Sequence, residues 1–121
     1  ADYGRIDIAL DPAPFTGGIT SLQALWQGVP FVTLKGASHA ARVGASILTT
    51  AGLGDLIAET PEDYAAIAAA LASDTARVAD LRQTMRERLA ATTLIDGAAF
   101  TAEFERALVK AWDESASRTT R

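Results

Sequence analysis

The sequence predicts an α/β fold in which a parallel sheet of about three strands is flanked by helices and the C-terminal third of the chain is helical. Two short apolar segments, residues 6–10 and 31–34, have the composition of strands, and the segment between them has helical spacing. From residue 60 onward, apolar residues recur only at helical spacing. The resulting order of elements, β-α-β-α-β-α-α-α, is typical of a parallel sheet covered by helices.

The first strand is expected over residues 6–10, an apolar run interrupted only by Asp7, which suits a buried parallel strand. The run ends at Asp11, and two prolines follow it at positions 12 and 14. Prolines restrict their own backbone and that of the preceding residue. We therefore expect a stiff loop between this strand and Gly18.

The next helix is predicted from about residue 20 to residue 27, with Gly28 just past its end and Pro30 preventing its continuation. Its expected inner side comprises Leu22, Leu25 and Trp26. Residues 31–34 are aromatic, β-branched or aliphatic over the length of a strand. A strand, a helix and a second strand in this order predict a right-handed crossover unit.

The remainder of the chain is predicted to contain a helix over residues 40–50, ended by Gly52 and Gly54, and a short strand or turn over residues 56–58. Thr60-Pro61-Glu62-Asp63 has the composition of a helix start, and everything beyond it is expected to be helical up to a polar tail over residues 114–121. We expect core packing for three apolar stripes, made of Tyr64, Ile67 and Leu71, of Val78, Leu81, Met85 and Leu89, and of Phe100, Phe104, Leu108 and Trp112.

Composition excludes several classes of protein. The 121 residues carry a net charge of −4 and their eleven basic residues are scattered, which argues against a nucleic-acid partner. The longest apolar run, residues 65–72, is far shorter than the roughly 18 to 20 residues that cross a membrane, so no membrane partner is expected. Without cysteine there is no disulfide or thiolate site, and we expect a cytoplasmic location. Because the sequence lacks an initiating Met and reaches a predicted strand at Ile6, we expect a segment of a longer polypeptide.

The predicted strand-helix-strand unit has the layout of a phosphate-binding unit. Gly17 and Gly18 let the backbone approach a ligand closely, and Thr20 opens a helix whose first amides lack intrahelical partners. Such a helix start attracts anions. In open parallel sheets ligands bind outside the carboxyl ends of the strands, where residues 11–20 and 35–42 are expected. Both loops are therefore predicted to face one crevice.

Several motifs in this order resemble one known family. They are Asp11-Pro12, Gly17-Gly18 with Thr20, ALWQGVPFVTL over residues 24–34, RVGAS over residues 42–46, Gly52-Leu53, and the late pattern of residues 94–96 with Phe100, Glu105 and Trp112. Together they resemble the C-terminal catalytic half of the O-linked N-acetylglucosamine transferase family in its bacterial SPINDLY-like branch. The resemblance spans nearly the whole chain, and the ordered combination is specific whereas the glycine pair with its threonine alone is not.

This resemblance implies a GT-B glycosyltransferase, built of two Rossmann-like halves with tetratricopeptide repeats upstream, that transfers N-acetylglucosamine from UDP to Ser or Thr hydroxyls of proteins. Residues 1–113 would be the distal part of the Rossmann-like nucleotide-sugar half. The positions matching Gly17, Gly18, Ile19 and Thr20 would hold the UDP phosphates, and Gln23 would meet the ribose. The resemblance implies UDP-N-acetylglucosamine as donor substrate, with no metal and no further cofactor.

The chain departs from the family pattern at three of these positions. Ile19 stands where threonine is usual, Thr16 where asparagine is usual, and Gln23 where a carboxylate is usual. Loss of the hydroxyl at Ile19 removes one phosphate contact, and an amide at Gln23 makes a weaker bond to ribose than a carboxylate does. No catalytic residue is assigned to this chain, because the family's proposed base and its acceptor surface lie in the other half and in the repeats.

Three single residues near the crevice admit two interpretations each. His39, the only histidine, would be a general base or, as we favour, a surface residue. Arg42 would contact phosphate or anchor its helix to Asp11 or another acid, and Lys35 would reach the diphosphate or remain solvated. Trp26 is expected in the core behind the phosphate-binding helix.

Three functions remain open at this stage. The first is the UDP-sugar-binding part of a glycosyltransferase, inactive as an isolated segment because the N-terminal half, the repeats and the protein acceptor are elsewhere. The second is a non-catalytic binding or scaffold module that keeps the Rossmann-like fold, and the third is an unrelated nucleotide binder that prefers adenine to uracil. A sheet of about three strands leaves an unpaired edge, so we also expect self-association by sheet extension.

Overall fold

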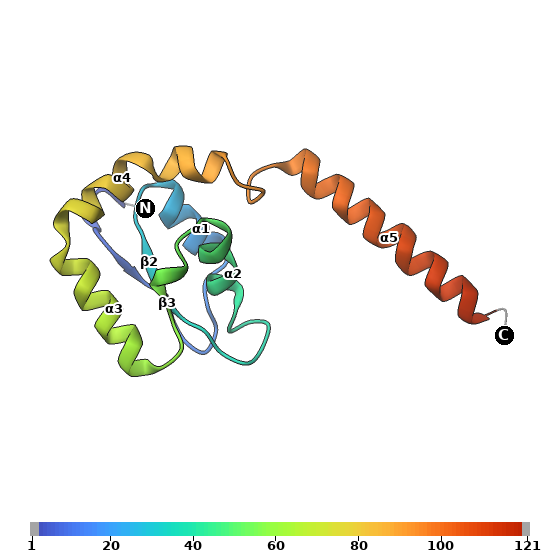
Figure 1. The fold of residues 1–121 in the computed structure, drawn as a ribbon, viewed down its shortest axis with the longest axis horizontal. Coiled ribbons are helices and arrows are strands. Elements are labelled where there is room, and N and C mark those ends of the chain that lie inside the picture. The colour runs from blue at the N-terminus through green and yellow to red at the C-terminus, as the bar shows by residue number, and fades with distance from the viewer. Residues whose placement is uncertain (1–2, 120–121) are drawn as a thin grey trace.

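Three short parallel strands form the sheet of this protein, whose computed structural model describes residues 3–119 (Figure 1). Strand β2 (Phe31–Leu34) lies in the middle, with β1 (Ala9–Leu10) and β3 (Ile57–Ala58) on either side of it. In the register, Ala9 lies opposite Phe31 and Thr33 opposite Ile57. The predicted α/β fold with a parallel sheet of three strands is confirmed.

Helices cover both faces of the sheet. The elements are the 3₁₀ turn η1 (Tyr3–Arg5), α1 (Ile19–Trp26), α2 (Val43–Thr50), the 3₁₀ turn η2 (Gly54–Leu56), α3 (Pro61–Ser73), α4 (Thr75–Ala90) and α5 (Gly97–Thr119). Figure 1 shows α3 on one side of β2 and α1 and α2 on the other, and all three contact β2. Helix α4 packs against both α1 and α3 and so joins the two layers. Among the described residues, no helix is long and apolar enough to cross a membrane.

The core is centred on β2 and on the inner face of α4. The first three residues of β2 are almost completely buried, because helices lie on both of its faces. Two of the three predicted stripes pack here. Val78, Leu81, Met85 and Leu89 are all buried, and from the first stripe Leu71 is buried while Tyr64 and Ile67 pack partly buried against the cluster.

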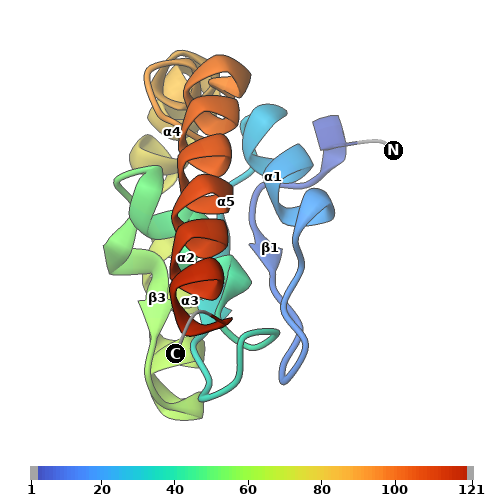
Figure 2. The ribbon, with the colours of Figure 1, turned by 90° about the vertical axis from the view of Figure 1, so that its right-hand side faces the viewer.

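The third stripe is not core, and that prediction is wrong. Helix α5 projects from the end of α4 into solvent, as the two perpendicular views show (Figures 1 and 2). Phe100, Phe104, Leu108 and Trp112 are 67%, 54%, 55% and 75% exposed. Helical periodicity identifies an apolar face but not what covers it, and no other described element packs extensively against this one.

The first strand is shorter and more exposed than predicted. Only Ala9 and Leu10 pair with β2, and Leu10 is 60% exposed because β1 has a neighbour on one side only. Residues before the strand are bound to α4 instead. The Arg82 guanidinium donates to the Ile6 carbonyl and lies 3.5 Å from the Asp7 carboxylate.

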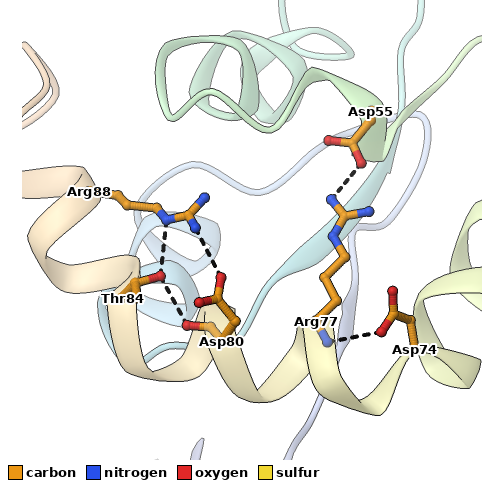
Figure 3. A network of polar contacts seen from close by, with 6 residues as sticks. All are labelled: Asp55, Asp74, Arg77, Asp80, Thr84 and Arg88. Atoms are coloured by element: carbon orange, nitrogen blue, oxygen red, sulfur yellow. Dashed lines mark hydrogen bonds and ion pairs between the residues drawn. The ribbon is translucent and has the colours of Figure 1, made fainter.

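Helix starts follow the local sequence signals. The Thr60 hydroxyl accepts the Asp63 amide at 3.1 Å, with Pro61 at the first helical position as predicted. Asp74 likewise accepts the Arg77 amide at 2.9 Å at the start of α4 (Figure 3). Helix α2 begins three residues later than predicted, because the Arg42 amide closes a turn onto the His39 carbonyl at 3.0 Å.

Exposed charges tie α4 to its surroundings (Figure 3). Arg77 reaches Asp55 of η2 at 2.5 Å, and Arg88 reaches Asp80 and Thr84 at 3.0 Å each within α4. Pairs of this exposure contribute at most about 1 kcal/mol. These ion pairs fix the positions of exposed side chains on α4, whereas the packing of its buried face keeps the helix in place.

Candidate functional site

Two loops meet at the carboxyl ends of the strands, as the sequence predicts. Thr16, in the loop between β1 and α1, is 2% exposed. Its amide and its hydroxyl donate to the Ala40 carbonyl at 3.1 and 2.9 Å, and its hydroxyl accepts the Gly44 amide at 3.1 Å. The Thr16 side chain thus joins the two predicted loops and accepts a hydrogen bond from a backbone amide in the first turn of α2.

A buried carboxylate holds the glycine turn. Asp11 follows β1 directly and is 4% exposed. Its Oδ1 accepts the Gly17 amide at 2.7 Å and the Ser21 hydroxyl at 3.1 Å, and its Oδ2 accepts the Thr33 hydroxyl at 2.8 Å. Among the described residues, no buried side-chain polar atom lacks a hydrogen-bond partner. The carboxylate therefore fixes the loop to both β2 and α1.

The packing around this carboxylate leaves no space for a side chain at Gly17 or Gly44. A Cβ on Gly17 would collide with the Ser21 hydroxyl and lie 2.9 Å from the Thr20 hydroxyl. A Cβ on Gly44 would collide with Asp11 Oδ2 and lie 2.7 Å from the Thr33 hydroxyl. Real Cβ atoms essentially never approach other atoms so closely. Glycine at both positions is thus explained by close approach rather than by backbone conformation.

The N-terminus of α1 presents free donors. Gly18 is the N-cap residue and offers no side chain to the helix. The first amide of this turn to find a backbone acceptor is that of Leu22, which donates to the Gly18 carbonyl at 3.0 Å. Within residues 3–119 the amides of Ile19 and Thr20 have no acceptor, and both residues are exposed. Unpaired amides and the helix dipole together favour an anion at this point.

The five predicted site residues fall into two groups. Gly17, Gly18 and Thr20 form the turn that enters α1, whereas Ile19 and Gln23 lie one turn apart on the outer face of that helix. Ile19 and Gln23 help to line an open pocket, whose other lining residues are Tyr3, Leu22, Trp26, Gln27 and Ile95. The turn and the pocket meet at Ile19.

Trp26 is a rim residue of this pocket and not a core residue, so the sequence prediction was wrong. Its side chain is 37% exposed, and the Arg86 guanidinium lies 5.2 Å from the centre of its ring. The Arg86 side chain also donates to the Trp26 carbonyl at 3.3 Å. The Trp26 ring thus connects α1 to α4 at the surface. Of the three residues predicted on the inner side of α1, Leu25 alone is fully buried.

The charged residues near the crevice are surface groups. His39 is exposed, as favoured from the sequence. Lys35 lies 2.7 Å from Glu59 in an exposed ion pair. Arg42 does not anchor to Asp11, because the carboxylate is already occupied by Gly17, Ser21 and Thr33. No group of three acidic or histidine side chains among the described residues has the geometry to hold a metal ion.

Sequence reasoning missed the polar network beneath the loop. Ser21, Thr33 and Tyr64 all converge on Asp11, with the Tyr64 hydroxyl donating to the Asp11 carbonyl at 2.8 Å. Burial raises the pKa of Tyr64, and the negative charge of Asp11 raises it further. Polar residues within otherwise apolar elements were the available signal, since a buried polar group requires a partner.

Comparisons with known proteins agree with one another. The model of glycosyl transferase family 41 matches residues 3–104. A barley protein described as a probable UDP-N-acetylglucosamine--peptide N-acetylglucosaminyltransferase SPINDLY is 41% identical over 110 residues, which cover 91% of this chain and 12% of the barley protein. The Caenorhabditis elegans UDP-N-acetylglucosamine--peptide N-acetylglucosaminyltransferase is 32% identical over 106 residues, covering 88% of this chain and 9% of that protein.

A solved structure extends the similarity to three dimensions. A mutant of the Thermobaculum terrenum O-GlcNAc transferase superimposes with a TM-score of 0.85 at 45% identity, covering 93% of this chain and 22% of that one. The chain therefore spans a small part of the proteins that it matches.

Proposed function

The chain belongs to glycosyl transferase family 41, and from this membership we propose that it is the distal part of the nucleotide-sugar-binding half of a GT-B glycosyltransferase. In this proposal the whole protein transfers N-acetylglucosamine from UDP to Ser or Thr hydroxyls of proteins, in the cytoplasm. The relatives that support it carry this donor and a peptide acceptor in their names. The N-terminal half, the tetratricopeptide repeats and the acceptor would be supplied outside this chain, which on its own would not turn over.

One observation carries the proposal at the level of atoms. Ile19 and Thr20 are exposed at the start of α1 and their amides have no acceptor within residues 3–119, beside a turn that Asp11 fixes. A nucleoside diphosphate is an anion, and hydroxyl and amide donors suit its oxygens. As the bond between sugar and diphosphate breaks, negative charge grows on the leaving group, and preorganised donors stabilise that charge.

Gln23 would serve the nucleoside rather than the phosphates. It lies on the outer face of α1, on the rim of the pocket that also includes Ile19 and Trp26. Its amide offers both a donor and an acceptor to a sugar hydroxyl. Because the pocket is open, part of its wall would come from other segments of the full-length protein.

Thermal unfolding with and without nucleotides tests this function. Ligand at 100 times its dissociation constant adds about 2.7 kcal/mol of stability, so UDP and UDP-N-acetylglucosamine should raise the melting temperature whereas ADP should not. Thr20→Val removes the hydroxyl at nearly constant volume and should reduce the shift, while Thr50→Val, an equivalent change at the end of α2, should not. A larger shift with ADP than with UDP would instead favour an unrelated nucleotide binder.

A second candidate function is a binding or scaffold module that has lost nucleotide affinity. Ile19 favours it, because this side chain is 77% exposed at the expected phosphate position and contributes no hydroxyl. Absence of any shift with uridine nucleotides in the full-length protein would support the scaffold function. Binding there, but not to the 121-residue chain, would support the donor-half proposal with contacts from outside the chain.

A further inference from the structure

The Gly17 amide, one of the donors expected to hold phosphate, already has a partner. It donates to Asp11 Oδ1 at 2.7 Å. A backbone amide carries one hydrogen, so this amide cannot hold a phosphate oxygen while it is bound to the carboxylate. The adjoining amides of Ile19 and Thr20 are free of partners within residues 3–119. The glycine turn thus contains one occupied donor beside two open ones.

Asp11 connects the turn to β2, α1 and α3. Its own amide donates to the Val32 carbonyl of β2 at 2.9 Å, and its carbonyl accepts the Tyr64 hydroxyl of α3 at 2.8 Å. Its carboxylate receives donors from the loop, from α1 and from β2. One residue therefore ties the loop to the sheet and to helices on both of its faces.

The carboxylate lies in a cradle that admits no additional atoms. A Cβ on Gly44 would collide with Oδ2, and a Cβ on Gly17 would lie only 3.0 Å from Oδ1 and collide with the Ser21 hydroxyl that binds it. Asp11 is 4% exposed and its oxygens face protein donors, so it is not a ligand for solvent cations or a base for substrate. Its negative charge is held immediately behind the expected anion site without contacting it.

We propose that Asp11 is the positioning residue of the phosphate-binding turn, and that it keeps the Gly17 amide from acting as a donor to the diphosphate. The Gly17 amide remains on Asp11 when ligand binds. The inference rests on the proposed function for its ligand, a nucleoside diphosphate, but its claim about Gly17 and Asp11 concerns the ligand-free chain as well. A phosphate oxygen that displaced Asp11 from Gly17 would bring two anions together in a site with little solvent, which like-charge repulsion opposes.

Amide exchange measured by NMR tests the arrangement directly. In the 121-residue chain without ligand, the Gly17 amide should exchange with solvent more slowly than the amides of Ile19 and Thr20. Titration with UDP should move the Ile19 and Thr20 amide signals and protect them, and should leave the Gly17 amide protected to the same degree. Rapid exchange at Gly17 without ligand, or its deprotection by UDP, would overturn the inference.

Variants of Asp11 separate positioning from general stability. Asp11→Asn keeps an oxygen for Gly17 and places an amide donor toward the Thr33 hydroxyl, so it should retain protection at Gly17 and most of the UDP affinity. Asp11→Ala removes the acceptor and should weaken UDP by about tenfold or more, with uridine affected much less, because uridine lacks the diphosphate. Equal weakening of UDP and uridine would mean that Asp11 acts only through folding.

Asp7→Ala is the matched control. It removes the same charge four residues earlier from a side chain that is 84% exposed and, among the described residues, bound to Arg82 alone. Gly17 protection and UDP affinity should stay at wild-type levels in this variant. If the full-length protein fails to bind UDP while Gly17 is protected as described, the proposed function fails and the assignment of Asp11 stands. If wild type binds UDP and the Gly17 amide loses its protection, the proposed function stands and the assignment of Asp11 fails.

Discussion

At the scale of single residues, the site depends on polar groups that are buried and paired. Asp11 and Thr16 each serve as a junction between two segments far apart in sequence, and each is nearly inaccessible to solvent. A hydrogen bond to a charged group contributes about 1.5 to 3 kcal/mol, and leaving such a group unpaired costs more. The geometry of an exposed turn is therefore determined by residues that are themselves buried.

Tyr64 gives this network a dependence on pH. Its pKa is raised in the folded chain, first by burial and then by Asp11, above the value near 10 of an unfolded chain. Folding thus favours the neutral phenol, whose contribution to stability is complete below about pH 10 and is lost as the pH rises through the raised pKa. We expect the free energy of unfolding to fall more steeply above about pH 10 in wild type than in Tyr64→Phe.

Urea unfolding at a series of alkaline pH values provides the measurement. Tyr64→Phe should also cost about 1 kcal/mol at neutral pH, through loss of the bond to the Asp11 carbonyl. Tyr3→Phe removes the other tyrosine of the chain and serves as the control. Parallel alkaline curves for wild type and Tyr64→Phe would contradict the assignment.

Two glycines end helices in the same way but in different surroundings. Gly28 and Gly52 have φ of 79° and 72°, and each follows a helix whose last carbonyls accept the glycine amide and the next amide along the chain. Gly52→Ala should cost about 1 to 2 kcal/mol, the strain of a left-handed residue. Gly28→Ala should cost more, because its Cβ would lie 2.6 Å from the Arg82 carbonyl of α4.

Chemical unfolding of the two variants compares these costs. Equal losses of stability would mean that α4 moves away from Gly28 without penalty. The sequence was sufficient to predict both glycines as helix ends, because their signal is local. It did not distinguish them, since the carbonyl opposite Gly28 lies 54 residues away in the chain.

At the scale of elements, caps and turns were predictable whereas exposure was not. Thr60 and Pro61 start α3 as predicted, because capping involves residues three positions apart. The strand predicted from residue 6 is instead two residues long. Ala9 and Leu10 pair with β2, whereas the Ile6 carbonyl is bound by Arg82. The glycine turn was predicted from its own residues, but Ser21 and Thr33 became part of the site only through tertiary packing.

Helices α4 and α5 have apolar stripes of similar appearance and opposite environments. Leu89 of α4 is completely buried, whereas Phe104 of α5 is 54% exposed and stacks on Phe100, with ring centres 6.1 Å apart. Leu89→Ala should cost about 2 to 5 kcal/mol through the cavity it leaves. Phe104→Ala should change stability by no more than about 0.5 kcal/mol. Urea midpoints measure both, and a large loss for Phe104→Ala would place α5 against the body in solution.

At the scale of the whole molecule, two apolar surfaces have no described partner. One includes Leu10 of β1, Phe15 of the loop after it and Ile19 at the start of α1, which are 60%, 73% and 77% exposed. The other is the apolar face of α5, a helix that projects away from the sheet (Figure 1). Strand β1 carries unpaired backbone groups on its outer edge, and such edges pair with other chains. The expected self-association by sheet extension is therefore one of two routes open to the chain.

Sedimentation velocity over a range of concentrations distinguishes these routes. If the edge of β1 is responsible, Leu10→Lys should shift the chain toward monomer, because a charge on an edge strand opposes pairing, and Trp112→Lys should leave the association unchanged. The reverse pattern would assign it to α5, whose stripe runs the length of a helix and buries more apolar area than a strand of two residues. A wild-type chain that stays monomeric throughout would contradict both, and would mean that the strand is too short and the helix too isolated to pair.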